Sequence, residues 1–233
     1  MTEPFRPAAL AAALVLAALP ALADSPVLVE LFTSQGCSSC PPADELLGEF
    51  AGRDDVVALG MHVDYWDYLG WTDEFARAEH TARQKAYSRA NGDRMIYTPQ
   101  IVVDGVARLP GNRQAAVRRA VDERHMHHSD APDIALSRSS AGVHVVIGAK
   151  GLGGVPVDVL VATFQPERKV VIEAGENAGH HITYANVVSA LRRAGTWDGT
   201  ARLEFTVEVP DGPVAVFLQK PGMGEVIAAA QLR

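Results

Sequence analysis

Apolar residues in the first half of this chain fall into short continuous runs separated by stretches with helical spacing. Three runs have the length and composition of buried β-strands: residues 27–32, 56–63 and 100–103. After the first run, Leu46, Leu47 and Phe50 mark one apolar face of a helix that ends near Gly52. The pattern therefore begins with a strand, a helix and a second strand.

Each remaining element of this half has a recognisable start or stop signal. Glycine after asparagine or aspartate ends helices and turns hairpins, because these residues tolerate left-handed backbone conformations. The signals predict a helix from Thr72 to about Arg89 that stops at Asn91-Gly92, a hairpin in which Asp104-Gly105 joins 100–103 to 106–109, and a helix from Gly111-Asn112 to about Glu123.

The second half of the chain has a different pattern. Residues 125–132 are polar and contain Pro132, so we interpret them as a linker. Beyond them apolar and polar positions alternate with a period of two, which indicates a small antiparallel sandwich interrupted by a short helix at residues 185–194. The expected strands are 133–138, 143–149, 156–164, 168–173, 201–209, 214–219 and 225–232. These patterns divide the chain into an α/β domain at 24–124 and a β-rich domain at 133–233.

The first 23 residues have the pattern of a secretory signal peptide. Arg6 precedes a continuous apolar run at 8–19, and Ala21-Leu22-Ala23 is a small-x-small cleavage site. The run is shorter than the ~20 apolar residues that span a bilayer, so we expect cleavage after Ala23 and no stable membrane anchor. A retained N-terminal anchor is the alternative. The expected location is periplasmic or secreted.

Charge and length narrow the function classes. The chain has 233 residues and a net charge of -7, and its basic patches are short helix faces such as Arg118-Arg119 and Arg192-Arg193. An acidic balance of this kind argues against nucleic-acid binding.

The two cysteines form a single motif, Cys37-Ser38-Ser39-Cys40, directly after the first strand. This spacing lets both sulfurs meet, so the pair can cycle between dithiol and disulfide. A zinc site would need four ligands, and no second Cys pair exists. An inert structural bridge is also possible in an exported protein. However, a bridge that closes so short a loop stabilises a fold weakly, and this favours redox use.

The order of elements, the Cys pair and the segment Tyr97-Thr98-Pro99-Gln100 resemble the thioredoxin fold. The resemblance implies a thioredoxin-like domain in which Pro99 forms a cis peptide bond and begins the strand beside the Cys pair. A trans proline at the start of an edge strand is the alternative.

Three motifs resemble a family of secreted bacterial proteins of unknown function with a thioredoxin-like N-terminal domain. They are FTSQGCSSCPPAD at 32–44, HVDYWDYLGW at 62–71 and YTPQ at 97–100. The segment Glu176-Asn177-Ala178-Gly179 is similar to the same family but has no known role there. This resemblance supports the fold more than it supports an activity.

The thioredoxin-like resemblance implies a role for each residue around the Cys pair. Cys37 is the nucleophile, Cys40 resolves the mixed disulfide, and Thr98 and Pro99 position the substrate. Pro41 and Pro42 complicate activation of Cys37, because they remove two amide hydrogens. Either the helix is kinked after Cys40, or it begins near Pro41.

Other residues near this site have two interpretations. Asp64, Tyr65 and Trp66 follow the second strand and are candidates for a substrate-facing wall near Cys37. The alternative for the aromatic residues is a hydrophobic cap on the sheet. Glu30 lies inside the first strand, where it could carry protons for Cys40 or, more commonly, pair with a positive charge.

We therefore expect an exported thiol–disulfide oxidoreductase, or a redox-linked protein of that type, with no cofactor. Its partners would be a protein or small-molecule thiol or disulfide and an external redox partner. Copper handling by Cys37, Cys40 and a histidine is one alternative. His125, His127 and His128 are candidate ligands, but surface histidine is the interpretation we favour. The other alternative is a binding module in which the Cys pair is only a local clip.

Overall fold

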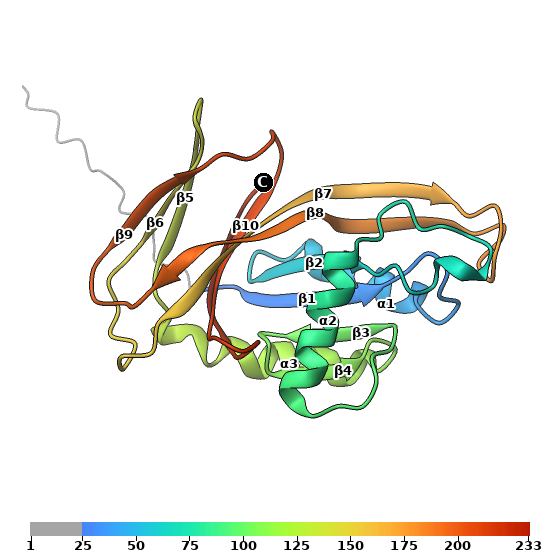
Figure 1. Ribbon diagram of the computed structural model, residues 1–233, viewed down its shortest axis with the longest axis horizontal. Helices are drawn as coiled ribbons and strands as arrows, with labels where there is room; N and C mark the ends of the chain where they lie inside the picture. The colour runs from blue at the N-terminus through green and yellow to red at the C-terminus, as the bar shows by residue number, and fades with distance from the viewer. Residues whose placement is uncertain (1–24) are drawn as a thin grey trace, which may run out of the picture.

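The structure is a computed structural model that describes residues 25–233 (Figure 1). The expected signal peptide at 1–23 lies outside the described residues. Within residues 25–233, none of the helices combines the length and the apolar character needed to cross a membrane.

The first half of the described chain contains three α-helices and four strands. The elements are β1 (Val27–Thr33), α1 (Pro41–Ala51), β2 (Val56–His62), α2 (Ala78–Asn91), β3 (Gln100–Val103), β4 (Ala107–Pro110) and α3 (Gln114–His125). Two short 3-10 helices, η1 (Asp67–Leu69) and η2 (His128–Asp130), lie in the connections.

The second half consists of strands. They are β5 (Ile134–Ser139), β6 (Gly142–Ile147), β7 (Val157–Val171), β8 (His181–Trp197), β9 (Leu203–Val207), β10 (Val214–Gln219) and β11 (Val226–Leu232). The long antiparallel strands β7 and β8 form a hairpin that runs along the molecule to the end that also carries the loop after β2 (Figure 1).

Strands from both halves join into one mixed sheet of eight strands, in the order β11-β10-β7-β8-β2-β1-β3-β4. A second sheet, β5-β6-β9, packs against strands β7 and β10 of the large sheet. Apolar side chains such as Val145, Val159 and Val216 form this contact. The predicted fold class, a thioredoxin-like α/β domain followed by a separate sandwich-like β domain, is therefore wrong. The described chain is mostly β, and its main sheet includes β7, β8, β10 and β11 from the second half.

The two halves of the large sheet meet at one bridge between β2 and β8. Gly60 pairs in parallel with Val187, and the Asn186 side chain donates a hydrogen bond to the Ala58 carbonyl at 2.9 Å. A Cβ on Gly60 would lie 3.1 Å from the Ala185 carbonyl oxygen, so glycine allows the close approach. The predicted helix at 185–194 is also wrong, because β8 pairs with β7 through this whole segment.

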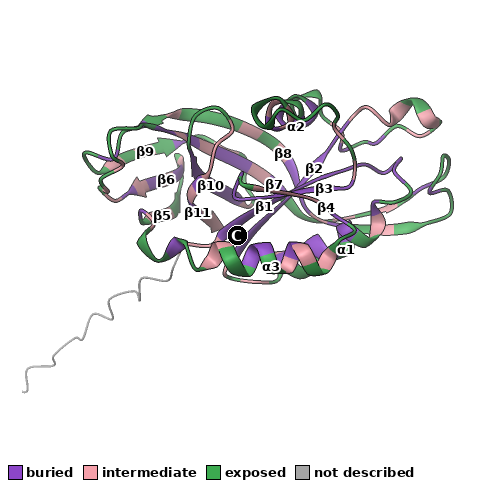
Figure 2. Ribbon diagram, turned by 90° about the horizontal axis from the view of Figure 1, so that it is seen from below, coloured by how far each residue is buried: buried purple, intermediate pink, exposed green. Residues whose placement is uncertain are grey.

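Strand β1 lies in the centre of the sheet, and all its residues are buried (Figure 2). It pairs in parallel with β2 and antiparallel with β3. Leu46 and Phe50 of α1 and Val121 of α3 cover one face of the sheet. Tyr87 of α2 packs on the other face with Phe217. This central position fixes the loop that follows β1.

Glu30 in β1 is fully buried and forms an ion pair with Arg83 of α2. Arg83 Nε donates to Glu30 Oε1 at 2.6 Å, and the Tyr87 hydroxyl donates to Oε2 at 2.7 Å. Gln219 of β10 accepts a further bond from Arg83 at 3.0 Å. Of the two interpretations of Glu30, the structure matches the one in which it pairs with a positive charge. Both of its carboxylate oxygens accept hydrogen bonds.

Candidate functional site

Cys37 and Cys40 form a disulfide in the loop between β1 and α1, with their Cα atoms 5.4 Å apart. Cys40 is the N-cap of α1, and Pro41 and Pro42 are its first two residues. Proline is favoured at the first helical position, where its missing N–H would have no partner in any case. Of the two alternatives for the prolines, the helix takes the second and begins at Pro41.

The start of α1 offers few amide donors to the sulfur of Cys37. The Cys40 amide donates to the Cys37 carbonyl, and the Ala43 and Asp44 amides both donate to the Cys40 carbonyl. The prolines between them have no N–H. The Ser39 hydroxyl lies 3.4 Å from Cys37 Sγ. A thiolate at Cys37 would thus be stabilised mainly by this hydroxyl and by the helix dipole.

We call residues 34–40, between β1 and α1, the Cys loop. The tip of the β7–β8 hairpin, residues 172–180, covers this loop, and we call it the strap. The Asn177 amide donates to the carbonyls of Gln35 and Cys37 at 2.8 and 3.0 Å. The Ser38 hydroxyl donates to Glu176 at 2.7 Å. Beneath the strap, Cys37 is only 2 % exposed. The sequence motifs predicted no role for Glu176 and Asn177, although the family resemblance includes both.

Replacing Asn177 by alanine is expected to speed reduction of the Cys37–Cys40 disulfide by dithiothreitol about tenfold. The strap must open before a reductant reaches Cys37, and the variant loses two hydrogen bonds that hold it closed. Such a pair contributes about 1–3 kcal/mol, and about 1.4 kcal/mol corresponds to tenfold. The rate is followed by stopped-flow tryptophan fluorescence. Asn112→Ala, at an exposed loop position, is the matched control, and equal rates in both variants would contradict a covering role.

Trp66 connects the Cys loop to the segment around Pro99. Its Nε1 donates to the Thr98 hydroxyl at 2.7 Å. Trp66 also packs closely on Gly36, because a Cβ atom added to Gly36 would lie 3.2 Å from the Trp66 Cβ. The Thr98-Pro99 peptide bond is cis, as the resemblance implied. Pro99 is buried beside Gly111, which also abuts Ala43 in the first turn of α1. The structure thus places Trp66, Thr98 and Pro99 around the Cys loop.

Asp64 and Tyr65 bond to α2. The Thr81 hydroxyl donates to Asp64 Oδ1 at 2.6 Å, and the Tyr65 hydroxyl donates to Gln84 at 3.1 Å. Burial raises the pKa of Tyr65 to about 12, so the phenol stays protonated at neutral pH. Both residues therefore fix the loop after β2 on α2, and the contact with the Cys loop comes from Trp66.

A cluster of buried polar side chains lies where β1 and β2 end, next to α1. Its members come from five segments of the chain: Thr33 of β1, Asp44 of α1, His62 of β2, Asp73 of the following loop and Tyr184 of β8. His62 Nδ1 donates to Asp73 Oδ2 at 2.7 Å, and Asp73 also accepts the Gln35 amide at 2.8 Å. Asp73 thus joins His62 to the Cys loop. Sequence reasoning assigned no role to this cluster.

Four atoms of this cluster are buried without a hydrogen-bond partner: Thr33 Oγ1, Asp44 Oδ2, His62 Nε2 and Tyr184 Oη. Buried polar atoms are nearly always paired, so four orphans at one place indicate a functional or solvated site. Burial raises the pKa of Asp44 to about 7, although the charge of His62 counteracts it. Asp44 is therefore poised to titrate near neutral pH.

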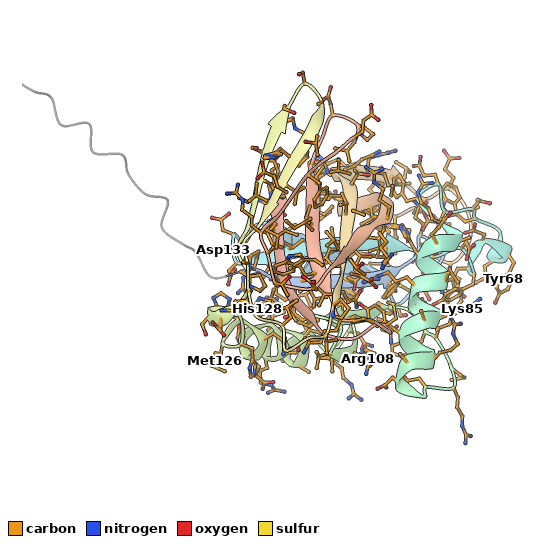
Figure 3. All side chains as sticks on the ribbon, turned by 60° about the vertical axis from the view of Figure 1, so that its left-hand side comes forward. Tyr68, Lys85, Arg108, Met126, His128 and Asp133 are labelled. Atoms are coloured by element: carbon orange, nitrogen blue, oxygen red, sulfur yellow. A yellow bond between two sulfur atoms is a disulfide. The ribbon has the colours of Figure 1, made fainter. Side chains whose placement is uncertain are left out.

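The candidate histidine ligands lie elsewhere. His128 and the neighbouring Met126 are at the end of the molecule opposite Tyr68, which belongs to the loop beside the Cys pair (Figure 3). His128 Nε2 pairs with Asp104 at 2.9 Å. Within residues 25–233, no three His, Cys, Asp or Glu side chains are grouped as metal ligands would be.

Comparison with known proteins identifies similar chains but no activity. A family model described as a protein of unknown function, DUF1223, matches residues 28–219. A structural-genomics crystal structure of a protein from Agrobacterium tumefaciens is 34% identical, with a TM-score of 0.77, covering 91% of this chain and 96% of that one. HBP35 of Porphyromonas gingivalis is 16% identical, with a TM-score of 0.60, covering 90% and 75% of the two chains, which is a likeness of fold alone. No curated protein matches the chain.

Proposed function

This chain belongs to the DUF1223 family of proteins of unknown function, and from the geometry around Cys37 and Cys40 we propose that it is an exported thiol–disulfide oxidoreductase. The observation that carries the proposal is a disulfide of two neighbouring cysteines at the N-terminus of a helix. Export rests on the signal-peptide pattern in residues 1–23. Outside the cytosol such a disulfide persists until a specific thiol attacks it.

The chemistry proceeds through a mixed disulfide. A substrate thiolate attacks Cys37 Sγ, the bond to Cys40 breaks, and Cys40 leaves as a thiolate. In the opposite direction the Cys37 thiolate attacks a substrate disulfide, and one substrate sulfur leaves as a thiolate. Cys40 then attacks the mixed disulfide, the Cys37–Cys40 bond forms, and the second substrate sulfur leaves. We take Cys37 as the side of attack because it keeps 2 % exposure, whereas Cys40 is fully buried at the start of α1. An external redox partner then returns Cys37 and Cys40 to their starting oxidation state.

Trp66 and Thr98 would form the substrate-contact surface, and the buried Pro99 would position Thr98. Thr98 and Trp66 are partly exposed, and they lie beside the Gly36-Cys37 turn. Tyr97 and Met95 precede Thr98 in an exposed segment, which adds apolar area on that side of the surface. An extended peptide with a cysteine fits such a surface better than a compact one, because the strap leaves Cys37 only limited access.

The test uses Cys40→Ala, in which Cys37 can attack but the mixed disulfide cannot be resolved. We expect reduced Cys40→Ala to accumulate mixed disulfides with exported proteins that contain a disulfide, because the Cys37 thiolate attacks that bond and displaces one of its sulfurs as a thiolate. We expect Cys37→Ala and the double variant to accumulate none. In wild-type protein, the expected reduction potential lies in the enzyme range of about -120 to -270 mV.

A structural clip gives a different pattern of results. Its potential would fall below about -300 mV, native Cys37 would not react with thiol reagents after reduction, and Cys40→Ala would trap nothing. That combination would refute the proposed function and direct attention to the β7–β8 hairpin as a binding element.

A further inference from the structure

A groove separates α1 from the β7–β8 hairpin. Helix α1 packs beside β8, and two hollows of about 690 and 610 Å³ lie between them. Both hollows are lined by Asp44, Glu45 and Thr183, so they are continuous, and we call them together the α1 groove. One end of the groove lies at the C-terminus of α1. The other end lies between Pro41 and His180 of the strap, beside the Cys loop.

Acidic side chains line the α1 groove. Four carboxyl groups lie along it, those of Asp44, Glu45, Glu49 and Glu167. Two of them already form ion pairs, with Arg118 and Lys169. Among residues 25–233, Asp44 and Glu45 form no ion pair. The part of the groove where the two hollows meet is therefore negatively charged, and its charge suits a cationic ligand.

Asp44 and Tyr184 present unpartnered polar atoms to this part of the groove. Both residues line the larger hollow and are buried, to 3 % and 2 % exposure. Asp44 Oδ2 and Tyr184 Oη have no hydrogen-bond partner, so they do not bond to each other. They are nevertheless neighbours, because the charge of Asp44 adds to burial in raising the pKa of the Tyr184 phenol. Since buried polar atoms are nearly always paired, the two oxygens fit a ligand that donates hydrogen bonds.

The positive groups of the protein near Asp44 are engaged elsewhere. The charge of His62 lowers the pKa of Asp44, but its Nδ1 pairs with Asp73 at 2.7 Å and its Nε2 bonds to no carboxyl group. Arg233 lines the far end of the groove and donates to a backbone carbonyl at the end of α1 at 2.6 Å. The histidines at 180–181 are exposed at the rim of the smaller hollow. Within the described residues, no cation of the chain pairs with Asp44.

Gly48 leaves one side of the groove open. It lies four residues after Asp44 on the same face of α1 and lines the larger hollow. A Cβ atom added to Gly48 would meet no other atom within 4 Å. Glycine is unfavourable in the middle of a helix, yet nothing packs against this position. The helix therefore keeps free space directly beside the unpartnered carboxyl oxygen.

From these observations we propose that the α1 groove binds a lysine or arginine side chain of an extended peptide, whose cationic group donates hydrogen bonds to the Asp44 carboxylate and the Tyr184 hydroxyl. Ammonium and guanidinium groups carry several donors and form their strongest hydrogen bonds with carboxylates. Because the groove leads to the Cys loop, this inference rests on the proposed exchange function. It names the substrate class, which is peptides with a basic residue near the reacting cysteine.

The geometry sets the spacing of the basic residue and the cysteine in such a peptide. Asp44 lies four residues after Cys40, which is about 6 Å along the helix axis. The Cα atom of Cys37 is 5.4 Å from that of Cys40. Asp44 and Cys37 are thus at most about 11 Å apart along this path, and an extended chain spans that distance with about three residues. We therefore expect the preferred substrates to have Lys or Arg about three residues from the cysteine.

The first experiment measures binding alone. Isothermal titration calorimetry at pH 8, where Asp44 with its pKa of about 7 is ionised, compares two acetylated peptides without cysteine that differ only in a central lysine or glutamine. We expect oxidised wild type to bind the lysine peptide about tenfold more tightly, because hydrogen bonds between charged partners are the stronger kind. Asp44→Asn should bind both peptides equally. Asp54→Asn removes an exposed carboxylate just beyond α1 and outside the groove, so this matched control should keep the preference.

Gly48→Leu tests the place of binding without removing a charge. The leucine side chain would extend into the larger hollow, and a helix accommodates leucine better than glycine, so urea unfolding should show no loss of stability. We expect this variant to bind the lysine peptide at least tenfold more weakly than wild type. Equal affinity of wild type for the two peptides, an undiminished preference in Asp44→Asn, or normal binding by Gly48→Leu would each overturn the inference.

A second experiment separates the groove from the proposed function. Oxidised protein is mixed with peptides that carry a cysteine about three residues from lysine or glutamine, and two peptide thiols become one disulfide as Cys37 and Cys40 take up two electrons. An approximately tenfold faster reaction of the lysine peptide in wild type, but not in Asp44→Asn, supports both proposals. If the lysine peptide binds but no thiol is oxidised and Cys40→Ala traps nothing, the proposed function fails and the groove stands. Equal oxidation rates would leave the function intact and refute the groove as its substrate site.

Discussion

Breaking the buried Glu30–Arg83 ion pair is expected to lower the free energy of unfolding by about 3–5 kcal/mol. Either Glu30→Leu or Arg83→Met leaves one charge buried without its partner. Arg83 is almost completely buried between Tyr87 and Phe217, with its guanidinium carbon 5.0 and 5.6 Å from the two ring centroids. Neither residue can reach water without disrupting the core.

The double variant Glu30→Leu/Arg83→Met separates pairing from packing. Replacing a whole buried ion pair by apolar residues is often close to neutral, so we expect it to be more stable than either single variant. Urea unfolding gives the free energies. Arg118→Met, which breaks an exposed pair with Glu49, is the control and should cost about 1 kcal/mol or less. Single variants at Glu30 and Arg83 that cost no more than this control would refute the importance of the pair.

Stability is expected to depend on pH through Asp44. Its pKa is about 7 in the folded protein and 3.8 in the unfolded chain, so the folded state binds more protons between these values. Stability from this group is therefore complete below pH 4 and is lost as the pH rises through 7. Each pH unit across that window corresponds to about 1.4 kcal/mol, so wild type should lose about 4 kcal/mol relative to Asp44→Asn.

The measurement compares urea unfolding of oxidised wild type and Asp44→Asn at several values between pH 4 and pH 8. The difference in unfolding free energy between the two proteins should grow steadily with pH. Taking this difference removes the contributions of titrating groups that both proteins share, such as His80 and His128. Glu45→Gln should show no such growth. A constant difference between wild type and Asp44→Asn would mean that Asp44 is ionised in the folded protein throughout this range.

Local signals in the sequence located most elements of the first half correctly. The strand at 100–103 matches β3, and α1 ends at Ala51, beside the predicted stop at Gly52. These elements depend on contacts within a few residues, and their turns contain the residues that such turns require. The helix predicted from Thr72 begins later, at Ala78, because η1 and an irregular segment occupy the residues after β2.

Long-range pairing was the part that the sequence did not reveal. Residues 185–194 contain Ala, Leu and Arg, which favour helices in isolation, yet β7 holds them in an extended strand. The pairing of Gly60 with Val187 requires a residue without a side chain at position 60 and the hydrogen bond of Asn186 to Ala58. A single glycine and a single asparagine form no periodic pattern, so the sequence does not predict this pairing. This bridge joins strands of both halves into one sheet, and that mostly β arrangement contradicts the predicted fold class.

The candidate site was only partly visible for the same reason. Cys37 and Cys40 are adjacent in sequence and form a recognisable motif, whereas Asn177, His62 and Asp73 come from distant segments. Asp44 was inside the first family motif, and its position four residues after Cys40 on a helix is a signal that could have been used. Its burial, which gives it an unusual pKa, follows only from the tertiary structure.

The strap has a consequence for how the protein is made. Asn177 covers the Cys loop from 140 residues further along the chain. At a synthesis rate of about 5–20 residues per second, that distance corresponds to about 7 to 28 seconds. During this interval the cysteine motif is not yet covered by the strap, so thiols and oxidants can reach the two cysteines and change their redox state. Once the strap has folded over the Cys loop, access to Cys37 is limited. The two cysteines therefore react faster with thiols and oxidants in the nascent chain than in the folded protein.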